Sequence, residues 1–390
     1  MATKNIAAAV RHVLPATRGF AFHLHREPEL SWGEVRTMDK VTEAIVNHFT
    51  EARIVRWKSG FWTDVVVNPD DPTLTMFRAD MDALPVQEAT GLPYSSRIQG
   101  VMHACGHDFH TAGLLGAYRA IARGLVRPTR NIRFVFQAAE ESPESGAKAM
   151  IEECVLENVV SAHGAHVWPY APVGTALCRP GPMMANPGVL RLKIRSAGGH
   201  VADPEHGSGA LRGAVCAIWG LLSSQFNVVP EGQPFVLEPV QCQAGDGVVT
   251  NVLPSEATLV FNIRHFLVGD QRDLLQAAIE GVIRTSVAKV PGAEVADLSF
   301  QWGAPALHNT PEDVERVGAL LGAQGLTVKE MAPILGAEDF SYFLGERPGS
   351  FWFFGAHTEG TGPIHSPTFV CNPKVLQGLI AYWLALATAP

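Results

Sequence analysis

The chain has 390 residues, of which 47% are hydrophobic and 17% charged, and its formal net charge is −8 at pH 7. It carries no dense run of Lys and Arg and no apolar stretch long enough to cross a bilayer, which argues against nucleic-acid and membrane partners. Its length favours two domains, and six widely spaced cysteines without a Cys-x-x-Cys pair predict reduced thiols in a cytoplasmic protein.

The first half of the chain alternates expected helices and strands. Residues 6–27 are expected to form a helix rather than a signal peptide, because basic side chains interrupt the apolar positions. A second helix, capped by the segment Ser31–Glu34, is expected to run through Phe49. The other elements expected here are strands at 65–67, 74–77, 132–136 and 159–162 and helices at 111–123 and 146–153. This alternation predicts an α/β domain with a mixed sheet flanked by helices.

A linker rich in proline and glycine, residues 179–188, precedes a change of pattern. The block beyond it has expected strands at 189–195, 248–252 and 257–263 and expected helices at 211–226 and 274–288. The last part has an expected helix at 311–322, a buried strand at 351–354 and a final helix at 374–388. We therefore expect a first domain formed by residues 1–184 and 304–390, interrupted by a smaller α+β domain at 185–303.

The segment from His103 to His110 concentrates metal-binding residue types. It holds three histidines, a cysteine and an aspartate within eight residues. Neutral imidazole and thiolate are common ligands of zinc and similar ions. Cys105 and His107 are only two residues apart, so one helix face cannot present both, but a loop bent at Gly106 could aim both at one point. The alternative is a helix N-terminus with polar capping residues.

Further residues of metal-binding type come directly after expected strands or the loop that follows one. They are Asp80, Asp82, Glu140, Glu141, His166 and His365. In an open α/β sheet, ligands bind outside the carboxyl ends of the strands. Each residue alone could be a turn former, a solvated corner or a loop residue. Together with Cys105 and His107 they predict a metal site.

The adjacent pair Glu140 and Glu141 suggests a division of labour. Neighbouring side chains diverge along a strand, so both carboxylates reach one site only if the chain bends there. One carboxylate could bind metal while the other handles protons. Divalent metal lowers the pKa of water towards about 7, and a nearby carboxylate can then serve as general base.

Nine motifs occur in one order along almost the whole chain. They are Phe22-His-Leu-His-Arg-Glu-Pro-Glu-Leu30, Arg78-Ala-Asp-Met-Asp-Ala-Leu-Pro85, His103-Ala-Cys-Gly-His-Asp108, Ala139-Glu-Glu141, His166-Val-Trp-Pro169, Gly198-Gly-His200, Asn251-Val-Leu-Pro254, Gly336-Ala-Glu-Asp-Phe340 and Ile364-His-Ser-Pro367. In this combination the chain resembles the metal-dependent amidohydrolases of aminoacylase/carboxypeptidase type, the group of hippurate hydrolase and indoleacetyl-amino acid hydrolase.

The resemblance implies a zinc-exopeptidase-like catalytic domain with two divalent ions per subunit. It also implies that the inserted domain is a lid and the surface of a homodimer or higher homo-oligomer. By motif position, the metal ligands are Cys105, His107, Glu141, His166 and His365. The resemblance makes the Cys105 thiolate a bridge between the ions. Zinc fits these ligands, and manganese, cobalt and nickel stay open because geometry and availability decide.

The resemblance also assigns roles to residues that do not bind the ions. Glu140 is the expected general base, and Asp80 and Asp82 orient the metal ligands. His200 is expected to stabilise the oxyanion, often across a dimer interface. Asn251 and Arg264 match positions that bind the free carboxylate of the substrate, a task suited to arginine. Without the resemblance, His200 and Asn251 would be loop and turn residues and Arg264 a surface charge.

Three departures from the family pattern bear on the substrate. Gln137-Ala-Ala139 precedes the glutamate pair and Ser142-Pro-Glu-Ser145 follows it, where the family has proline and a glycine run. Glu144 thus adds a carboxylate that is either solvated or a bias against acidic acyl groups. Glu205 stands where the family often has a histidine, His206 comes one residue later, and Gly209-Ala-Leu211 replaces the usual Asp-Pro. These changes affect the lid contacts and the substrate range.

The expected activity is hydrolysis of the amide bond of an N-acyl-L-amino acid by metal-activated water. The sequence leaves the acyl group and the amino acid open. A dipeptidase or carboxypeptidase using the same two ions is the nearest alternative. A binding protein without catalysis would have no need of Glu140, and a single-metal or redox site at Cys105 would leave the other strand-end residues unexplained.

Overall fold

The computed structural model describes residues 2–47, 53–203 and 205–389. Their contacts divide the chain into two compact units. The larger unit comprises residues within 1–183, 308–332 and 339–390, and the smaller unit comprises residues within 184–307 and 333–338. Within the described ranges, no helix is long and apolar enough to span a membrane.

The larger unit is built on a mixed sheet in which eight strands are described, in the order β1-β2-β4-β3-β5-β16-β6-β15. The strands are β1 Ile54–Trp57, β2 Gly60–Val65, β3 Leu74–Asp80, β4 Ile132–Gln137, β5 Val159–Trp168, β6 Thr175–Cys178, β15 Thr327–Glu330 and β16 Gly349–Gly355. The central strands β4, β3, β5 and β16 are parallel to their neighbours in this group. Every residue of β3, β4 and β16 is buried, as expected for strands covered on both faces.

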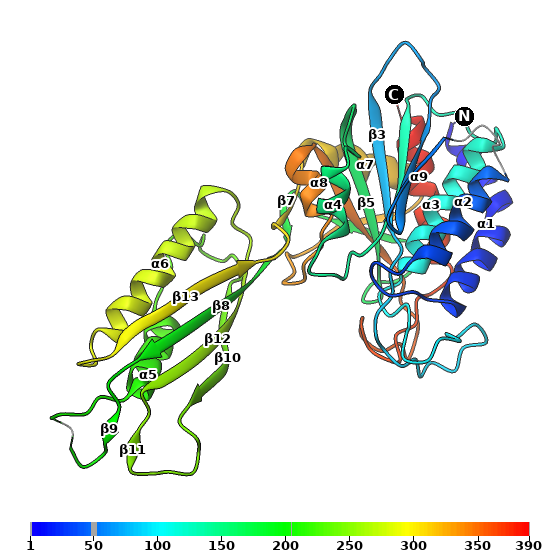
Figure 1. Ribbon diagram of the computed structural model, residues 1–390. Helices are drawn as coiled ribbons and strands as arrows, with labels where there is room; N and C mark the ends of the chain where they lie inside the picture. The colour runs from blue at the N-terminus through cyan, green and yellow to red at the C-terminus, as the bar shows by residue number, and fades with distance from the viewer. Residues whose placement is uncertain (1, 48–52, 204, 390) are drawn as a thin grey trace. The chain divides into compact units, whose positions relative to one another are not determined.

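Helices cover this sheet on both faces (Figure 1). The helices of this unit are α1 Ala2–Arg26, α2 Val35–Val46, α3 His107–Ala122, α4 Gly146–Glu152, α7 Pro311–Ala323, α8 Ser341–Glu346 and α9 Val375–Thr388. Helix α3 packs closely against α1 and α9. A Cβ atom on Gly113 would lie 3.0 Å from Leu379 Cβ, and one on Gly116 would lie 2.7 Å from Thr17 Oγ1. The small residues of α3 therefore permit close helix packing.

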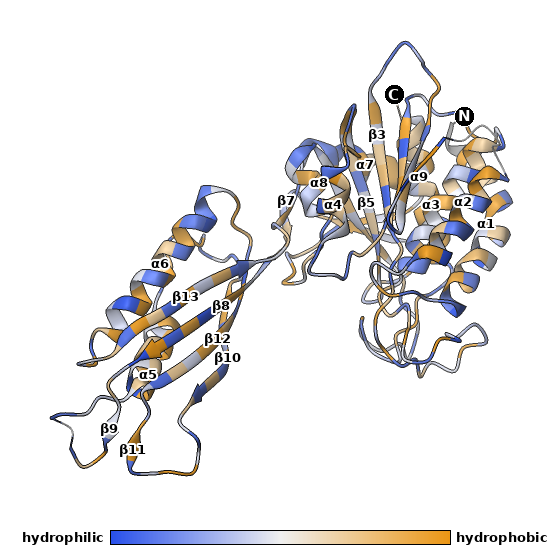
Figure 2. Ribbon diagram, in the orientation of Figure 1, coloured by the Kyte–Doolittle hydropathy of each residue, from blue (hydrophilic) through white to orange (hydrophobic). Residues whose placement is uncertain are grey.

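The smaller unit has a four-stranded antiparallel sheet, in the order β10-β12-β8-β13, among the described residues. Its elements are β8 Asn186–Arg195, β9 Gly199–His200, α5 Ala210–Ser223, β10 Val236–Ala244, β11 Val252–Leu253, β12 Glu256–His265, α6 Asp270–Val287 and β13 Glu294–Trp302. Burial alternates along β8 and β12, and their inward side chains form one core with α5 and α6. Figure 2 shows hydrophobic and hydrophilic residues interspersed along the strands of this sheet. Where the chain passes between the units, β7 Gly181–Met184 pairs with β14 Leu307–Asn309.

The predicted fold class is confirmed: a mixed sheet flanked by helices and a separate antiparallel insert are both present. Several local predictions are wrong. Strand β5 continues to Trp168, so His166 lies inside a strand instead of after it. Strands β10 and β13 were not predicted, and only Val252 and Leu253 form a strand near 248–252. The expected linker contains β7 and the start of β8.

The segment Ser31–Glu34 does not cap α2 as predicted. Helix α2 begins at Val35, and its N-cap residue Glu34 makes no side-chain capping hydrogen bond. The predicted end of this helix, Phe49, lies outside the described residues. The side chains of Ser31, Trp32 and Glu34 bond elsewhere, as described below.

Candidate metal centre

The carboxyl ends of the parallel strands β3, β4, β5 and β16 meet at one edge of the large sheet. Asp80 is the last residue of β3, and Glu140 and Glu141 follow the end of β4 by three and four residues. His166 lies two residues before the end of β5. Asp80, Glu140, Glu141 and His166 therefore gather at the sheet edge formed by the carboxyl ends of these strands, as the sequence predicted.

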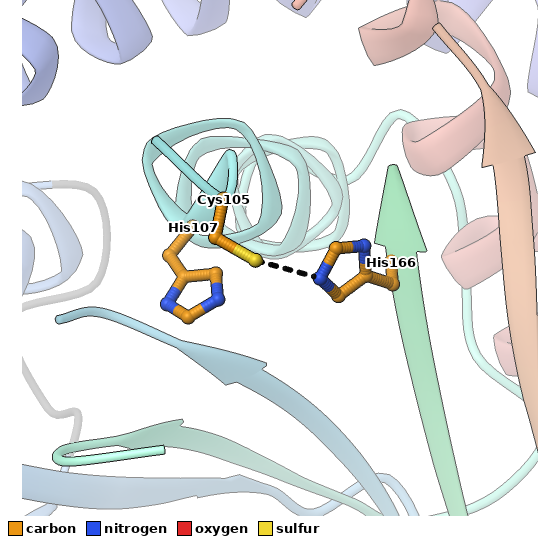
Figure 3. A group of neighbouring side chains, drawn as sticks. All are labelled: Cys105, His107 and His166. Atoms are coloured by element: carbon orange, nitrogen blue, oxygen red, sulfur yellow. Dashed lines mark hydrogen bonds between the residues drawn. The ribbon is translucent and has the colours of Figure 1, made fainter. Parts of the chain in front are cut away.

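Cys105, His107 and His166 lie side by side (Figure 3). Cys105 Sγ is 3.2 Å from His166 Nε2. The chain bends between Cys105 and His107 because Gly106 has φ 95°, a left-handed conformation that favours glycine. A Cβ atom at this position would also lie 2.5 Å from Val167 Cγ2. Any other residue at Gly106 would disturb the approach of the loop to β5.

The candidate ligands form overlapping groups whose ligand atoms lie within 4.8 Å of one another. One group is Cys105, His107 and His166, and a second is Cys105, Glu141 and His365. A third joins His107 to Glu140 and Glu141. Since Cys105 belongs to the first two groups, its sulfur stands where two ions could share a ligand.

Two unpaired polar atoms in this cluster suit a bound cation. His107 Nε2 and Glu141 Oε1 are buried and have no hydrogen-bond partner among the described residues. His365 Nε2 lies 3.0 Å from Glu141 Oε1 without hydrogen-bond geometry. Buried polar atoms normally find partners, and two ligands of one ion approach each other in this way. The donor set of thiolate, imidazole and carboxylate suits zinc and related divalent ions.

Hydrogen bonds orient the imidazole ligands. His166 Nδ1 donates a hydrogen bond to the carbonyl oxygen of Val167 at 2.6 Å. Its Nε2, which faces Cys105, is then unprotonated and has a lone pair for a metal. His107 Nδ1 lies 3.1 Å from Asp82 Oδ1, which leaves its Nε2 free for a metal. Both arrangements are the usual support for metal-binding histidines. They match the orienting role expected of Asp82.

Asp80 supports the site less directly than expected. Its Oδ2 is 3.9 Å from His107 Nε2, while its Oδ1 accepts a 2.6 Å hydrogen bond from His110 Nδ1. His110 Nε2 in turn accepts the backbone N–H of Val167 at 2.9 Å. Asp80 therefore ties α3 to β5 through His110. The sequence did not assign this role to His110, although its i, i+3 spacing from His107 places both on one helix face.

A buried arginine was also missed. The Arg78 guanidinium donates to Asp80 Oδ2 at 2.7 Å, to Asp339 Oδ1 at 2.8 Å and to Gln137 Oε1 at 2.7 Å. Asp339 also accepts from Ser145 Oγ at 2.7 Å. This network joins the ends of β3 and β4 to the loop after Glu141. Arg78 lies in a quoted motif, but nothing local indicates a partner 261 residues away.

The electrostatics of the cluster favour bound positive charge. Burial and the carboxylates of Glu141, Glu140 and Asp80 raise the pKa of the Cys105 thiol well above its ordinary value. Burial alone would lower the pKa of His107, but Asp80 and Asp82 raise it to about 10. Burial holds the pKa of His166 well below its ordinary value, so this ring is neutral and able to bind metal. A cation is what would stabilise the Cys105 thiolate here.

The expected lid residues lie in the smaller unit and are not all together. His200 on β9 pairs with Val252 on β11, and the Asn251 carbonyl accepts the N–H of Val201 at 3.0 Å. His200 and Asn251 are thus neighbours and exposed. Arg264, near the far end of β12, donates to Asn262 Oδ1 at 3.1 Å. The β9–β11 ribbon lies near the start of β12, because the N–H of Ser196 bonds to the carbonyl of Ser255. Arg264 lies eight residues after the first residue of β12, Glu256, which is roughly 27 Å along a strand.

Comparison with known proteins identifies the family. The model of Peptidase family M20/M25/M40 matches residues 76–389. N-acetylcysteine deacetylase of Bacillus subtilis is 33% identical over 93% of this chain and 94% of its own. Thermostable carboxypeptidase 1 of Saccharolobus solfataricus is 34% identical over 93% and 92%. The YXEP protein of Bacillus subtilis, a dinuclear metal binding peptidase, has 28% identity and a TM-score of 0.83 over 97% and 98%. The chain belongs to Peptidase family M20/M25/M40.

Proposed function

We propose that the protein hydrolyses the amide bond of N-acyl-L-amino acids with two divalent ions per subunit, most simply zinc. The observation that carries this proposal is the pair of ligand groups sharing Cys105, with Glu140 beside them. A relative whose name describes deacetylation of N-acetylcysteine supports the substrate class. All six cysteines are free thiols, which supports a reducing, cytoplasmic setting.

The ions would be held by Cys105, His107, Glu141, His166 and His365. When bound, they supply Lewis acidity towards the amide carbonyl and lower the pKa of the attacking water. Asp82 keeps the His107 ring oriented, and the carbonyl of Val167 does the same for His166. Burial of these side chains excludes bulk water, and the lower dielectric strengthens the electrostatic interactions among them.

Glu140 moves the proton. Its carboxylate takes a proton from the attacking water and returns it to the leaving amine. Glu140 Oε1 accepts the backbone N–H of Asp339 at 3.4 Å, which helps to hold the carboxylate beside the ligand groups. Its neighbour Glu141 faces His365 and Cys105 as a ligand. The bend after β4 thus lets adjacent carboxylates do different work.

The substrate carboxylate and the oxyanion are assigned to the smaller unit. Arg264 would bind the carboxylate with Asn251, and His200 would stabilise the oxyanion. Arg264 and the His200–Asn251 pair are too far apart to meet one small substrate from a single copy of this unit. A homodimer, in which one chain lends His200 and Asn251 to its partner, resolves the separation.

An apolar stripe on α5 supports such a dimer. Leu211, Val215, Trp219 and Leu222 recur at helical spacing and are exposed, and Trp219 is 73% exposed. Large exposed apolar side chains in one line are typical of a surface that another protein covers. This stripe lies in the unit that the proposal makes the lid and the dimerisation surface.

The test is a panel of N-acyl amino acids and dipeptides, assayed with chelated protein reloaded with Zn²⁺, Mn²⁺ or Co²⁺. Preferred cleavage of N-acyl substrates supports the proposal. Preference for substrates with a free α-amino group would instead favour a dipeptidase or carboxypeptidase, the activity named for one relative. Tight metal uptake without cleavage of any member would favour a binding protein.

A further inference from the structure

We infer that the segment Ser31–Glu34 is a positioning clamp for Glu140 and Glu141, with Glu34 as its principal member. The segment lies between α1 and α2, more than one hundred residues before the glutamate pair. Its three side chains, those of Ser31, Trp32 and Glu34, bond to that pair's loop or to the aspartate beside it. The inference rests on the proposed roles of Glu140 and Glu141.

The loop needs an external hold because its turn is unfavourable. Ala139, directly before the pair, is buried and has φ 55°. A residue with a side chain adopts this left-handed conformation only when its surroundings impose it. This turn is the bend that sends Glu140 and Glu141 into the same site. Whatever holds Ala139 therefore sets the position of both carboxylates.

Glu34 holds this turn. Its Oε1 accepts the backbone N–H of Ala139 at 2.7 Å, and its Oε2 accepts Ser59 Oγ at 2.6 Å. The glutamate is fully buried. Its own carbonyl accepts the N–H of Met38 in the first turn of α2 at 2.8 Å, so its backbone is anchored in a helix. The carboxylate is thus a rigid support.

The rest of the segment grips the pair from its other side. Trp32 Nε1 donates to Ser142 Oγ at 3.2 Å, one residue after Glu141. Ser31 Oγ donates to Asp82 Oδ2 at 2.8 Å, and the same oxygen accepts the N–H of Glu141 at 2.9 Å. Contacts therefore lie before, at and after the pair. Directional hydrogen bonds at three points indicate positioning rather than general packing.

Loss of the clamp should affect the two ligand groups unequally. Removing the Glu34 carboxylate leaves the N–H of Ala139 buried without its partner and frees the turn. Glu140 and Glu141 would then move. Cys105 lies in the loop before α3 and His166 in β5, whereas the carboxylate of Glu34 bonds to Ala139 and Ser59. The group containing Glu141 should weaken while the group containing His166 persists.

The experiment compares E34A, E34Q and E29A by Co²⁺ titration, followed through its absorption spectrum, and by kinetics. For E34A we expect the thiolate–Co²⁺ band to remain, the second Co²⁺ to bind at least about 10-fold more weakly, and kcat to fall about 100-fold with KM nearly unchanged. E34Q retains an oxygen to accept the N–H of Ala139 and should recover most of both losses.

E29A is the matched control for E34A, because each variant removes a carboxylate that accepts a backbone N–H. Glu29 accepts the N–H of Thr37 at 2.8 Å and Arg36 Nε at 2.8 Å, so it anchors the start of the same helix without a bond to the catalytic loop. It should leave Co²⁺ binding and kcat as in the unmodified protein. If E34A does not fold, E34D, which withdraws the carboxylate by one methylene, replaces it with the same expected pattern.

Two results would overturn the clamp. One is normal affinity for both Co²⁺ ions with normal kcat in E34A or E34D. The other is equal loss in E29A, which would indicate that loosening α2 is sufficient. If the unmodified protein cleaves no N-acyl amino acid, the proposed function fails, whereas the Co²⁺ titration still decides for or against the clamp.

Discussion

The candidate metal ligands of the larger unit and the expected lid residues of the smaller unit are built in opposite ways. Cys105, His107 and His166 are buried and oriented through hydrogen bonds to neighbouring strands and loops. His200 and Asn251 are exposed on a two-residue ribbon. Under the proposed function, the chemistry is preorganised within one unit, whereas another copy of the chain would complete the substrate contacts.

The largest expected effect concerns Glu140, beside the candidate metal ligands of the larger unit. E140Q should lower kcat about 10³-fold, because general-base catalysis contributes on this scale, while metal content stays unchanged. Metal content and kcat are measured on the same preparation. E144Q serves as control, since Glu144 is exposed in the same loop, and it should retain activity on neutral acyl groups. An active E140Q protein would remove Glu140 from the mechanism.

A smaller effect is expected from the residues that orient the ligands. D82N disturbs the contact with His107 Nδ1 and the bonds from Ser31 and Glu141, so metal affinity and activity should fall about 10- to 100-fold. The measurement is Zn²⁺ affinity by competition with a chelator. The exposed Asp70 supplies a control, D70N, of the same charge change. Equal behaviour of the two variants would contradict an orienting role for Asp82.

Mixing two inactive variants tests whether His200 acts on the partner chain. H200A and E140Q should each be nearly inactive, but a mixed dimer has one complete site if His200 acts on the partner chain. Activity should therefore return on mixing. W219E in both variants should prevent dimer formation, seen by sedimentation, and abolish the recovery. No recovery from stable mixed dimers would mean that His200 acts within its own chain or not at all.

The smallest expected effect concerns pH and Glu34. Burial and the nearby Asp82 raise the pKa of Glu34 to about 7. The folded protein then binds more protons than the unfolded chain between about pH 4.5 and 7. The contribution of Glu34 to the free energy of unfolding therefore falls as pH rises through that window, by up to about 3 kcal/mol. Chemical unfolding should show that E34Q loses less stability than the unmodified protein between pH 5 and 8. Parallel stability curves would contradict the raised pKa.

The sequence predicted which edge of the large sheet carries the candidate metal ligands, because the residue types at the strand ends mark that edge. The apolar runs at 74–77 and 132–136 are followed a few residues later by Asp80 and by Glu140 and Glu141, and parallel strands bring such ends together. Strands β10 and β13 escaped prediction because they are edge strands with mostly exposed or half-exposed side chains, including Pro239, Gln241 and Asp297. Apolar residues alternate only in the second half of each strand, Val240–Ala244 and Leu298–Trp302, and the pairing register shifts near Pro239 and Asp297.

The residues that support the site could not be predicted in the same way. The bonds from Glu34 to Ala139 and from Arg78 to Asp339 span 105 and 261 residues. No local periodicity encodes such pairings, and Ser31–Glu34 also resembles a capping segment. The bend at Gly106 was predictable because a short spacing of ligands required it, whereas the left-handed turn at Ala139 has no glycine to announce it.

The most direct test of the central claim is a titration of chelated protein with Zn²⁺ while cleavage of an N-acyl amino acid is followed. The shared Cys105 and the two ligand groups predict that two ions bind per chain and that activity develops as the second site fills. Full activity at one ion per chain would contradict a dinuclear mechanism. Two tightly bound ions without cleavage of any N-acyl amino acid would contradict the proposed reaction.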